Sequence, residues 1–155
     1  MMTPEQRLRE LGIEIRTSSR PAGNYSAAAR SGSLLFLSGK APVAVDGQKP
    51  RGRLGMEYDS HDGYRFARSA CLDLLGAMRD AIGSLDKVSR IVELHGSLCT
   101  TPDFEEHARV MDGASDLLAE VFGPLGDHAR SVIGVNSLRD GVPLTVKAII
   151  ECAPQ

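Results

Sequence analysis

The fold is decided by residues 60–82, which read SHDGYRFARSACLDLLGAMRDAI. Apolar side chains recur in this stretch at spacings of three and four, which is the period of one face of an α-helix. These side chains are Tyr64, Ala67, Cys71, Leu74, Leu75, Met78 and Ile82. Ser60 is suited to cap the start of such a helix, and Gly83 is suited to cap its end. The pattern therefore predicts one long amphipathic helix.

The two segments that follow this helix differ in period. Residues 88–99 alternate between apolar and polar side chains, which is typical of a half-buried strand. The polar set is Glu93, His95 and Ser97, and the apolar set is Val92, Leu94, Gly96 and Leu98. A second helix is expected to start at residues 101–103, Thr-Pro-Asp, and to present five residues on its packed face. Those five are Ala108, Met111, Ser115, Leu118 and Phe122.

Short strands are expected in pairs toward both ends of the chain. The first pair is Ser26–Arg30 and Leu34–Ser38, and the second pair is Ser131–Asn136 and Val142–Ile150. Turn-forming residues join the partners of each pair, at 30–33 and at 139–141. In the last strand every second residue is apolar, whereas Thr145 and Lys147 point to the opposite face. With Glu93 and His95 they make that face too polar for a second core, and it could instead face partner subunits and line a polar site there.

A short helix is expected ahead of these elements, within an N-terminal helical extension of residues 1–12. Thr3 is a typical N-cap, Pro4 is favoured at the first helical position, and Gly12 can end the helix. The order that follows is strand-strand-helix-strand-helix-strand-strand. It predicts an α+β fold, in which two helices pack on one face of a mixed β-sheet. We expect residues 1–155 to form a single domain.

Length, composition and charge exclude several classes of function. The chain has 155 residues, of which 42% are hydrophobic and 25% are charged, as in ordinary globular domains. A net charge of −2, 5% aromatic residues and no Trp disfavour a nucleic-acid-binding protein. The sequence has neither the apolar run of a signal peptide nor one long enough to span a membrane. Three widely spaced cysteines indicate no disulfide framework, so we expect a cytoplasmic protein.

Histidines and one arginine are the candidates for chemistry. The four histidines lack metal-ligand spacing, so no metal site is expected, and surface or capping roles are favoured for them. They are His61, His95, His107 and His128. Arg130 lies where a Gly- and Pro-rich loop enters a strand, and an arginine there can present a rigid fork to a carboxylate. A structural ion pair explains the same pattern equally well.

Five segments occur together in the order of a known family. They are Gly23-Asn24-Tyr25, Leu34 to Pro42, Met111 to Leu118, His128 to Ser131 and Gly141 to Ala148. Together they resemble the Rid family, the reactive intermediate deaminases, which are also called YjgF-like or L-PSP endoribonucleases. The likeness extends over residues 11–153.

The resemblance implies a homotrimer with a chorismate-mutase-like fold, whose sheets form a central barrel and whose ligand sites lie between subunits. For deaminase members it implies hydrolysis of small reactive enamines or imines, of the 2-aminoacrylate type, to keto acids and ammonia. It implies neither a metal nor an organic cofactor. The expected partners are a small carboxylate-bearing imine or keto acid and further copies of this chain, while neither nucleic acid nor a membrane is favoured.

The resemblance also implies roles for residues at matching positions. Arg130 matches the arginine that grips the substrate carboxylate, and Tyr25 matches a tyrosine that lines the pocket. Ser38 and Gly39 match a pair at a strand end beside the ligand. Asp112 occupies a helix position at which asparagine is usual. A bidentate cation with donors nearby suits a small anionic imine that is attacked by water.

The last strand departs from the deaminase pattern. Thr145 stands where deaminase members carry a glutamate that positions the attacking water, and Lys147 stands where a second acid is usual. Val132 replaces a common cysteine. A threonine hydroxyl can hold a water, but it cannot take the proton as a carboxylate does. Arg130 and Thr145 are thus the candidate catalytic residues, and the general base is missing from its expected position.

Three functions are compatible with these residues. An enamine or imine deaminase leads, and a trimeric protein that binds small carboxylates without catalysis is the alternative. An endoribonuclease is the least favoured, because the chain is weakly acidic, poor in aromatic residues and without a histidine pair suited to acid–base cleavage.

Overall fold

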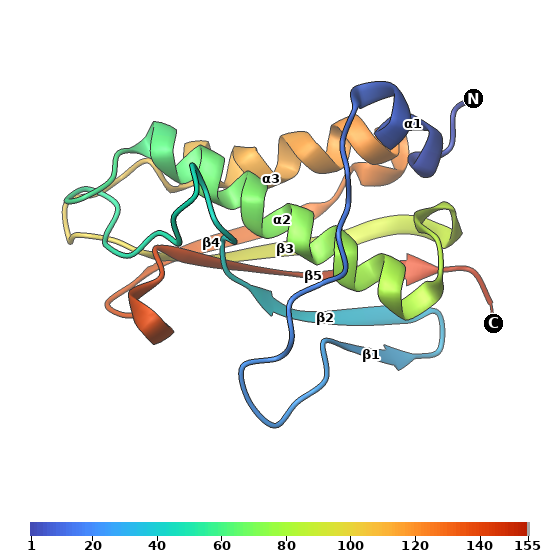
Figure 1. Ribbon diagram of the computed structural model, residues 1–155, viewed down its shortest axis with the longest axis horizontal. Coiled ribbons are helices and arrows are strands. Elements are labelled where there is room, and N and C mark those ends of the chain that lie inside the picture. The colour runs from blue at the N-terminus through green and yellow to red at the C-terminus, as the bar shows by residue number, and fades with distance from the viewer. Residues whose placement is uncertain (155) are drawn as a thin grey trace.

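The computed structural model describes residues 1–154 as three α-helices and five β-strands (Figure 1). The helices are α1 (Pro4–Leu11), α2 (Ser60–Ile82) and α3 (His107–Phe122). The strands are β1 (Ala28–Ser31), β2 (Leu34–Lys40), β3 (Val88–Cys99), β4 (Ala129–Val135) and β5 (Leu144–Cys152). Short 3₁₀ turns lie at Leu85–Lys87, Gly123–Gly126 and Arg139–Gly141. None of the helices within residues 1–154 is both long and apolar enough to cross a membrane.

The five strands form one mixed sheet in the order β1-β2-β5-β3-β4. Neighbouring strands are antiparallel except β3 and β4, which are parallel because α3 carries the chain back between them. β1 and β4 are therefore the two edges of the sheet (Figure 1). The predicted α+β fold and order of elements are confirmed. The expected pairing of the last two strands is wrong, because β3 lies between β4 and β5 and bonds to both.

The long helices α2 and α3 cover one face of the sheet, and the core lies between them and the strands (Figure 1). Leu74 and Met78 of α2 are fully buried there, as are Leu144 and Ile150 of β5. Burial of each such side chain contributes about 1.5–3 kcal/mol. Every second residue of β5 is buried, as predicted. The other face, which neither α2 nor α3 covers, is called the bare face below.

The two long helices approach each other closely at Gly113 of α3. A Cβ atom at this position would overlap the backbone carbonyl of Tyr64 on α2. Glycine is required because neither backbone can retreat without moving a whole helix. This contact fixes the position of α3, and with it the side chains that α3 presents toward β4.

The helix α2 spans the predicted residues, but its N-cap differs from the prediction by one residue. Asp59, and not Ser60, is the N-cap, since its side chain accepts a hydrogen bond from the Asp62 N–H. The Asp62 side chain accepts a bond from the Asp59 N–H in return, which completes a capping box. Ser60 is buried inside the first turn. Gly83 is the C-cap as predicted, with a φ of 89° that favours glycine.

The start of α3 also lies further along the chain than predicted, at His107. The residues around 99–101 pair instead with the loop before α2. The Leu54 N–H donates to Cys99 O at 2.9 Å, and the Thr101 N–H donates to Leu54 O at 3.0 Å. These bonds hold the segment extended, so tertiary pairing overrides the local helix-start signal at residues 101–103.

A bulge in β3 shifts the predicted alternation at Val92. Ile91 pairs with Ile150 and Glu93 pairs with Ile149, so β3 uses two residues where β5 uses one. Ile91 is consequently the buried residue, and Val92 is only partly buried. Beyond the bulge, the predicted alternation holds as far as Leu98, and Cys99 at the end of the strand is buried as well.

Candidate functional site

Arg130 lies at the β4 edge of the sheet and turns toward α3. It pairs in register with Leu94, which is fully buried beneath the helices. Its Nη1 donates to Asp112 Oδ1 at 2.8 Å and to Ser115 Oγ at 3.1 Å. Its Nη2 donates to Ala108 O at 3.4 Å, and its Nε makes no hydrogen bond within residues 1–154. Part of the guanidinium fork is therefore unused inside the chain.

Ser115 and His128 extend this contact into a chain of hydrogen bonds. Ser115 Oγ lies 2.9 Å from His128 Nε2, and His128 Nδ1 lies 2.5 Å from Gly126 O. A carbonyl oxygen only accepts, so Nδ1 carries a proton, and in the corresponding neutral tautomer Nε2 accepts from the Ser115 hydroxyl. Ser115 Oγ then accepts from Arg130, which fixes the direction of the guanidinium.

The sequence does not predict the hydrogen-bond chain from Arg130 through Ser115 to His128. It predicts Ser115 on the packed face of the second helix and a surface or capping role for His128. Asp112 and Ser115 are three residues apart and so share a helix face, which is the signal that could have grouped them. His128 lies only two residues before Arg130, but sequence alone does not indicate that both turn toward α3.

A second group of predicted residues lies where β2 adjoins β5. A Cβ atom at Gly39 would lie 3.9 Å from Thr145 Cβ, so these two residues are in contact. The β2–β5 register shifts at Ser38 and Gly39, and such bulges commonly re-aim side chains near functional sites. The Ser38 hydroxyl donates to Ser26 O at 2.6 Å, which ties the bulge to the segment before β1.

Tyr25 lies at the same side of the molecule, just before β1. Its hydroxyl accepts a hydrogen bond from the Ala22 N–H at 3.0 Å, which holds the ring over the turn at residues 22–25. The side chain is exposed, and it is adjacent in sequence to Ser26, the residue that Ser38 contacts. Tyr25, Ser38, Gly39 and Thr145 together are called the β2 group below.

The predicted site residues therefore form two groups that one chain keeps apart. The second group, called the β4 group, is Arg130 with Asp112. Three strand spacings separate β2 from β4, which is about 14 Å at the usual spacing of about 4.8 Å. The Arg130 side chain turns toward α3, whereas Thr145 stands on the bare face.

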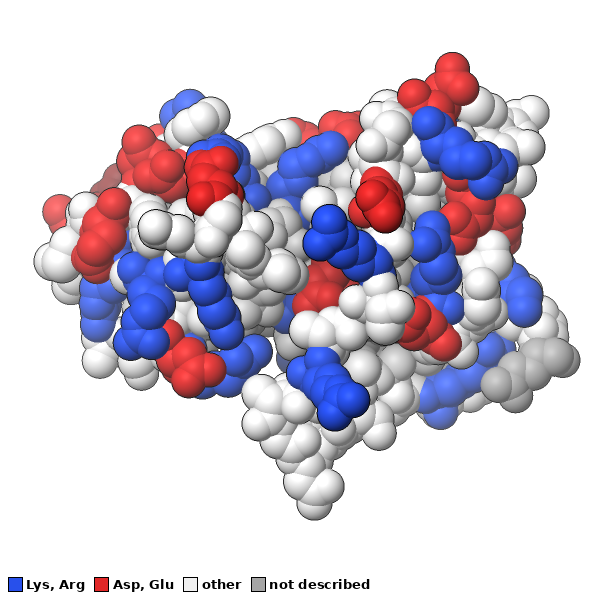
Figure 2. Space-filling view, in the orientation of Figure 1, with Lys and Arg blue, Asp and Glu red and all other residues white. Residues whose placement is uncertain are grey.

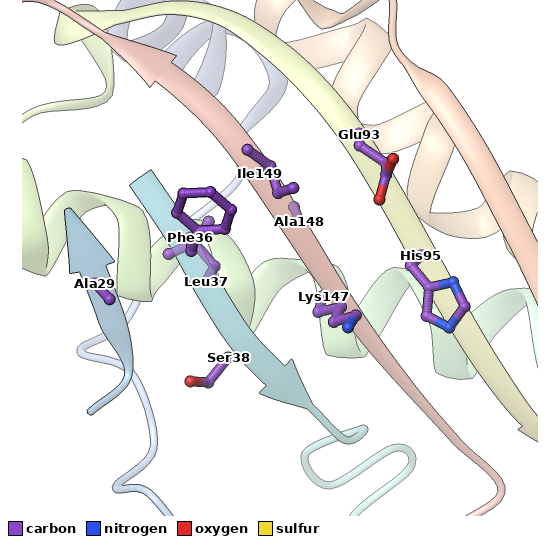
Figure 3. A pocket seen from close by; sticks show the side chains of 9 residues that line it. All are labelled: Ala29, Phe36, Leu37, Ser38, Glu93, His95, Lys147, Ala148 and Ile149. Atoms are coloured by element: carbon purple, nitrogen blue, oxygen red, sulfur yellow. The ribbon is translucent and has the colours of Figure 1, made fainter. Parts of the chain in front are cut away.

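A cavity of about 310 Å³ lies on the bare face next to the β2 group (Figure 3). Ser38 lines it together with Glu93, His95 and Lys147, three of the polar residues that the sequence places on the face opposite the helices. His95 Nδ1 lies 2.6 Å from Ser131 Oγ, and His95 pairs in register with Lys147. The sequence favoured a surface or capping role for His95. The registers of β3, β4 and β5 show which of these polar residues are neighbours, and they add Ser131 of β4 to the group.

Cysteine chemistry and metal binding have few candidates within residues 1–154. Burial raises the pKa of the Cys71 thiol to about 12, so this thiol stays protonated and unreactive. Cys99 and Cys152 are also buried. No three His, Cys, Asp or Glu side chains in this part of the chain gather closely enough to hold a metal ion.

Comparisons with known proteins agree with this fold. Residues 5–148 match the family described as "YjgF/chorismate mutase-like, putative endoribonuclease". The chain is 37% identical over 145 residues to Protein TCP17 of Trypanosoma cruzi, an alignment that covers 93% of this chain and 91% of that protein.

Solved structures show the same similarity. A structure described as a "putative endoribonuclease" from Shewanella oneidensis MR-1 has a TM-score of 0.91 at 33% identity, over 97% of this chain and 99% of that chain. A protein of unknown function from Agrobacterium tumefaciens has a TM-score of 0.87 at 33% identity, over 97% and 92%. The YjgF gene product of E. coli has a TM-score of 0.61 at 25% identity, over 87% and 93%. The chain therefore belongs to the YjgF/chorismate mutase-like family and has that family's fold.

Proposed function

We propose that the protein is an enamine or imine deaminase, which hydrolyses small reactive imino acids of the 2-aminoacrylate type to keto acids and ammonia. The observation that carries this proposal is Arg130. Its guanidinium is oriented by Asp112 and Ser115, yet its Nε is without a hydrogen-bond partner in residues 1–154. An oriented fork with an unused donor edge is suited to a carboxylate.

The two groups of site residues support a site formed between copies of the chain. The β4 group supplies a cation at one edge of the sheet, and the β2 group supplies hydroxyl groups near the other. Neither group alone holds both a carboxylate anchor and a place for water. A homotrimer that sets the β4 edge of one copy against the β2 group of the next would complete the site.

The chemistry required of each group is modest. A guanidinium that binds the carboxylate orients the small imine, which removes most of the orientational entropy of the reaction. The Ser38 hydroxyl donates to Ser26 O, so its oxygen can still accept a hydrogen bond from the imine N–H or from water. The Thr145 hydroxyl can hold the water, although it is not a base.

The experiment that tests this function follows keto-acid release from an imino acid that is generated in the assay by a dehydratase or an amino-acid oxidase. We expect the wild type to accelerate the release and Arg130→Ala to remove the effect. Arg65→Ala is the matched control, because Arg65 forms an ion pair with Asp46 on the surface at 2.8 Å. No acceleration by the wild type with several imino acids would overturn the proposal.

Binding of small carboxylates without catalysis is the second candidate. The observation that favours it is that Thr145 and Lys147, neither of them an acid, stand at the two positions of β5 nearest the proposed site. Calorimetry distinguishes it from the deaminase. Binding of a keto acid that depends on Arg130, together with no hydrolysis, would support it, and the absence of binding would exclude it.

The endoribonuclease named in the family description has less support in this chain. Lys and Arg are interspersed with Asp and Glu on the face shown in Figure 2, without a continuous basic track. RNA binding relies on such a track and on exposed aromatic side chains for stacking. Digestion of RNA by a homogeneous preparation, lost in Arg130→Ala, would reverse this ranking.

A further inference from the structure

The proposed deaminase has no carboxylate where a general base is needed, because Thr145 occupies that position. The cavity on the bare face is lined by two other basic groups of the neighbouring strand β3, Glu93 and His95, of which His95 is nearer to Thr145 in the strand register (Figure 3). We infer that His95 is the general base that activates the attacking water, an inference that rests on the proposed function. Ser38, a member of the β2 group, lines the same cavity, so a ligand held there and the imidazole share one space.

The strand register places His95 opposite Lys147 and diagonal to Thr145. Ser97 of β3 pairs directly with Thr145 of β5, and His95 lies two residues earlier on the same face of β3. His95 Nε2 is directed along the strand toward Ser97, whose Oγ is 3.5 Å away. A water held by the Thr145 hydroxyl would therefore lie on the Nε2 side of the imidazole.

Ser131 orients the ring from the other side. Its Oγ lies 2.6 Å from His95 Nδ1. When Nδ1 carries the proton and donates it to Ser131, Nε2 retains the lone pair that a base requires. Ser131 follows Arg130 directly on β4, so one strand turns its arginine toward α3 and its serine toward the base. Ser131 is a positioning residue in this arrangement.

Charged groups face His95 from two strands. Glu93 lies two residues before it on β3, and Lys147 lies opposite it on β5 (Figure 3). β4 contributes only the neutral Ser131 at this level of the sheet. Imidazole is the side chain whose ordinary titration lies closest to neutral pH, which suits it to take and return a proton during turnover.

The reaction balances with water as the only co-reactant. The water oxygen bonds to the imine carbon, the C=N π electrons move to nitrogen, and one water proton passes to His95 Nε2. The imidazolium returns this proton to nitrogen, which gives a neutral carbinolamine. His95 then takes the hydroxyl proton while the carbonyl forms and the C–N bond breaks. The proton leaves with the nitrogen as ammonia, and the histidine is neutral again.

The test is the pH profile of kcat/KM for His95→Gln, measured with the same imino-acid assay. We expect the wild-type rate to fall as the pH is lowered through the imidazole range, because a protonated ring is no base. His95→Gln should be about 100-fold slower at pH 7 and independent of pH over that range. His61→Gln is the control, since His61 is exposed on the first turn of α2, and it should keep the wild-type rate and profile.

A second pair of measurements separates a catalytic role from a structural one. His95→Gln should bind a keto acid with a Kd within about twofold of wild type, as expected when only proton transfer is lost. The double variant with Thr145→Glu and His95→Gln should be at least about tenfold faster than His95→Gln alone, since the glutamate supplies a carboxylate base beside the same water. Loss of keto-acid binding in His95→Gln would assign the histidine a structural role and overturn the inference.

The remaining outcomes distinguish this inference from the function on which it rests. If His95→Gln keeps the wild-type rate and pH profile while Arg130→Ala is inactive, the deaminase stands and His95 is not its base. If the wild type itself does not hydrolyse imino acids, both proposals fail together.

Discussion

Two ion pairs between an arginine and a carboxylate, Arg79 with Glu5 and Arg130 with Asp112, differ in how many of their nitrogen and oxygen atoms make hydrogen bonds. Arg79 Nε and Nη2 donate to the two Glu5 oxygens at 3.1 and 2.7 Å, and its Nη1 donates to Ile15 O at 3.2 Å. All three nitrogens of Arg79 are engaged. Asp112, by contrast, takes one bond from Arg130 through a single oxygen.

The carboxylates differ as well. The Glu5 side chain is 18% exposed and also accepts the Leu85 N–H at 3.0 Å, whereas the Asp112 side chain is 52% exposed. Burial alone raises the pKa of the Glu5 carboxyl, but bonds from Arg79 and Leu85 and the nearby positive charges outweigh burial and lower it. A saturated, shielded pair holds α1 onto α2. The half-open pair leaves its arginine available to a ligand.

The largest effect expected from this comparison is on folding, at Arg79. Arg79→Met leaves the shielded Glu5 carboxylate without its partner, which should lower the free energy of unfolding by about 2 kcal/mol. For a chain of this size, the melting temperature should fall by about 4–8 °C. Arg130→Met should lower the unfolding free energy by less than about 1 kcal/mol, because Asp112 remains solvated. Equal losses of stability in the two variants, measured by denaturant titration, would remove the distinction.

The second prediction concerns the pH dependence of the Glu5 contribution. Its pKa is lower in the folded chain than in the unfolded chain, so the ionised form stabilises the fold above the unfolded value of 4.5. This stabilisation is lost as the pH falls through the lower folded value. We expect Glu5→Gln to be less stable than wild type by about 1 kcal/mol at pH 7, and the difference to shrink as the pH is lowered below 4.5.

Glu10→Gln provides the matched control for that titration. Glu10 lies on the same helix, α1, and is exposed. Its substitution should leave the unfolding free energy unchanged at pH 7 and at acid pH. A stability difference between wild type and Glu5→Gln that grows toward acid pH would contradict a lowered pKa of Glu5 in the folded chain.

The third prediction is a gain of affinity at Asp112. Asp112→Asn removes the charge that competes for Arg130 but keeps an oxygen that can accept its N–H. We expect keto-acid binding to tighten by about fivefold, and the unfolding free energy to change by less than about 0.5 kcal/mol. Calorimetry measures the first quantity and denaturant titration the second. Weaker binding in Asp112→Asn would show that the carboxylate helps to hold the ligand.

The smallest effect is expected at Ser115. Ser115→Ala removes one hydrogen bond to Arg130 and leaves Asp112 to orient the guanidinium alone. Binding of a keto acid should weaken by about threefold, which corresponds to the net value of one hydrogen bond. The same substitution at Ser69, which donates no bond to the site and accepts the Val43 N–H, should leave binding unchanged.

Much of this architecture follows from local sequence. The period of residues 60–82 specifies α2, and the alternation after Leu144 specifies which face of β5 is buried. The junction before β4 identified Arg130 as the candidate for a carboxylate contact. These features could be predicted because each depends on residues only a few positions apart.

The features that the sequence did not predict depend on contacts between distant parts of the chain. The start of α3 is set by backbone pairing with Leu54, and the bulge at Val92 is set by the register against β5. The contact between His95 and Ser131 joins residues 36 positions apart on parallel strands. Each depends on partners distant in sequence, whose relative placement no local pattern records.

The close contact at Gly113 has a consequence for redesign of this protein. It makes α3 a fixed reference, so Asp112 and Ser115 cannot be moved relative to β4 without displacing a whole helix. The bulge at Ser38 and Gly39 is half-buried, and Ser38 bonds there to the segment before β1, through its hydroxyl to Ser26 O and its N–H to Ala27 O. Attempts to broaden the range of ligands should therefore vary Ser38 and Gly39 in the bulge and leave the sequence of α3 unchanged.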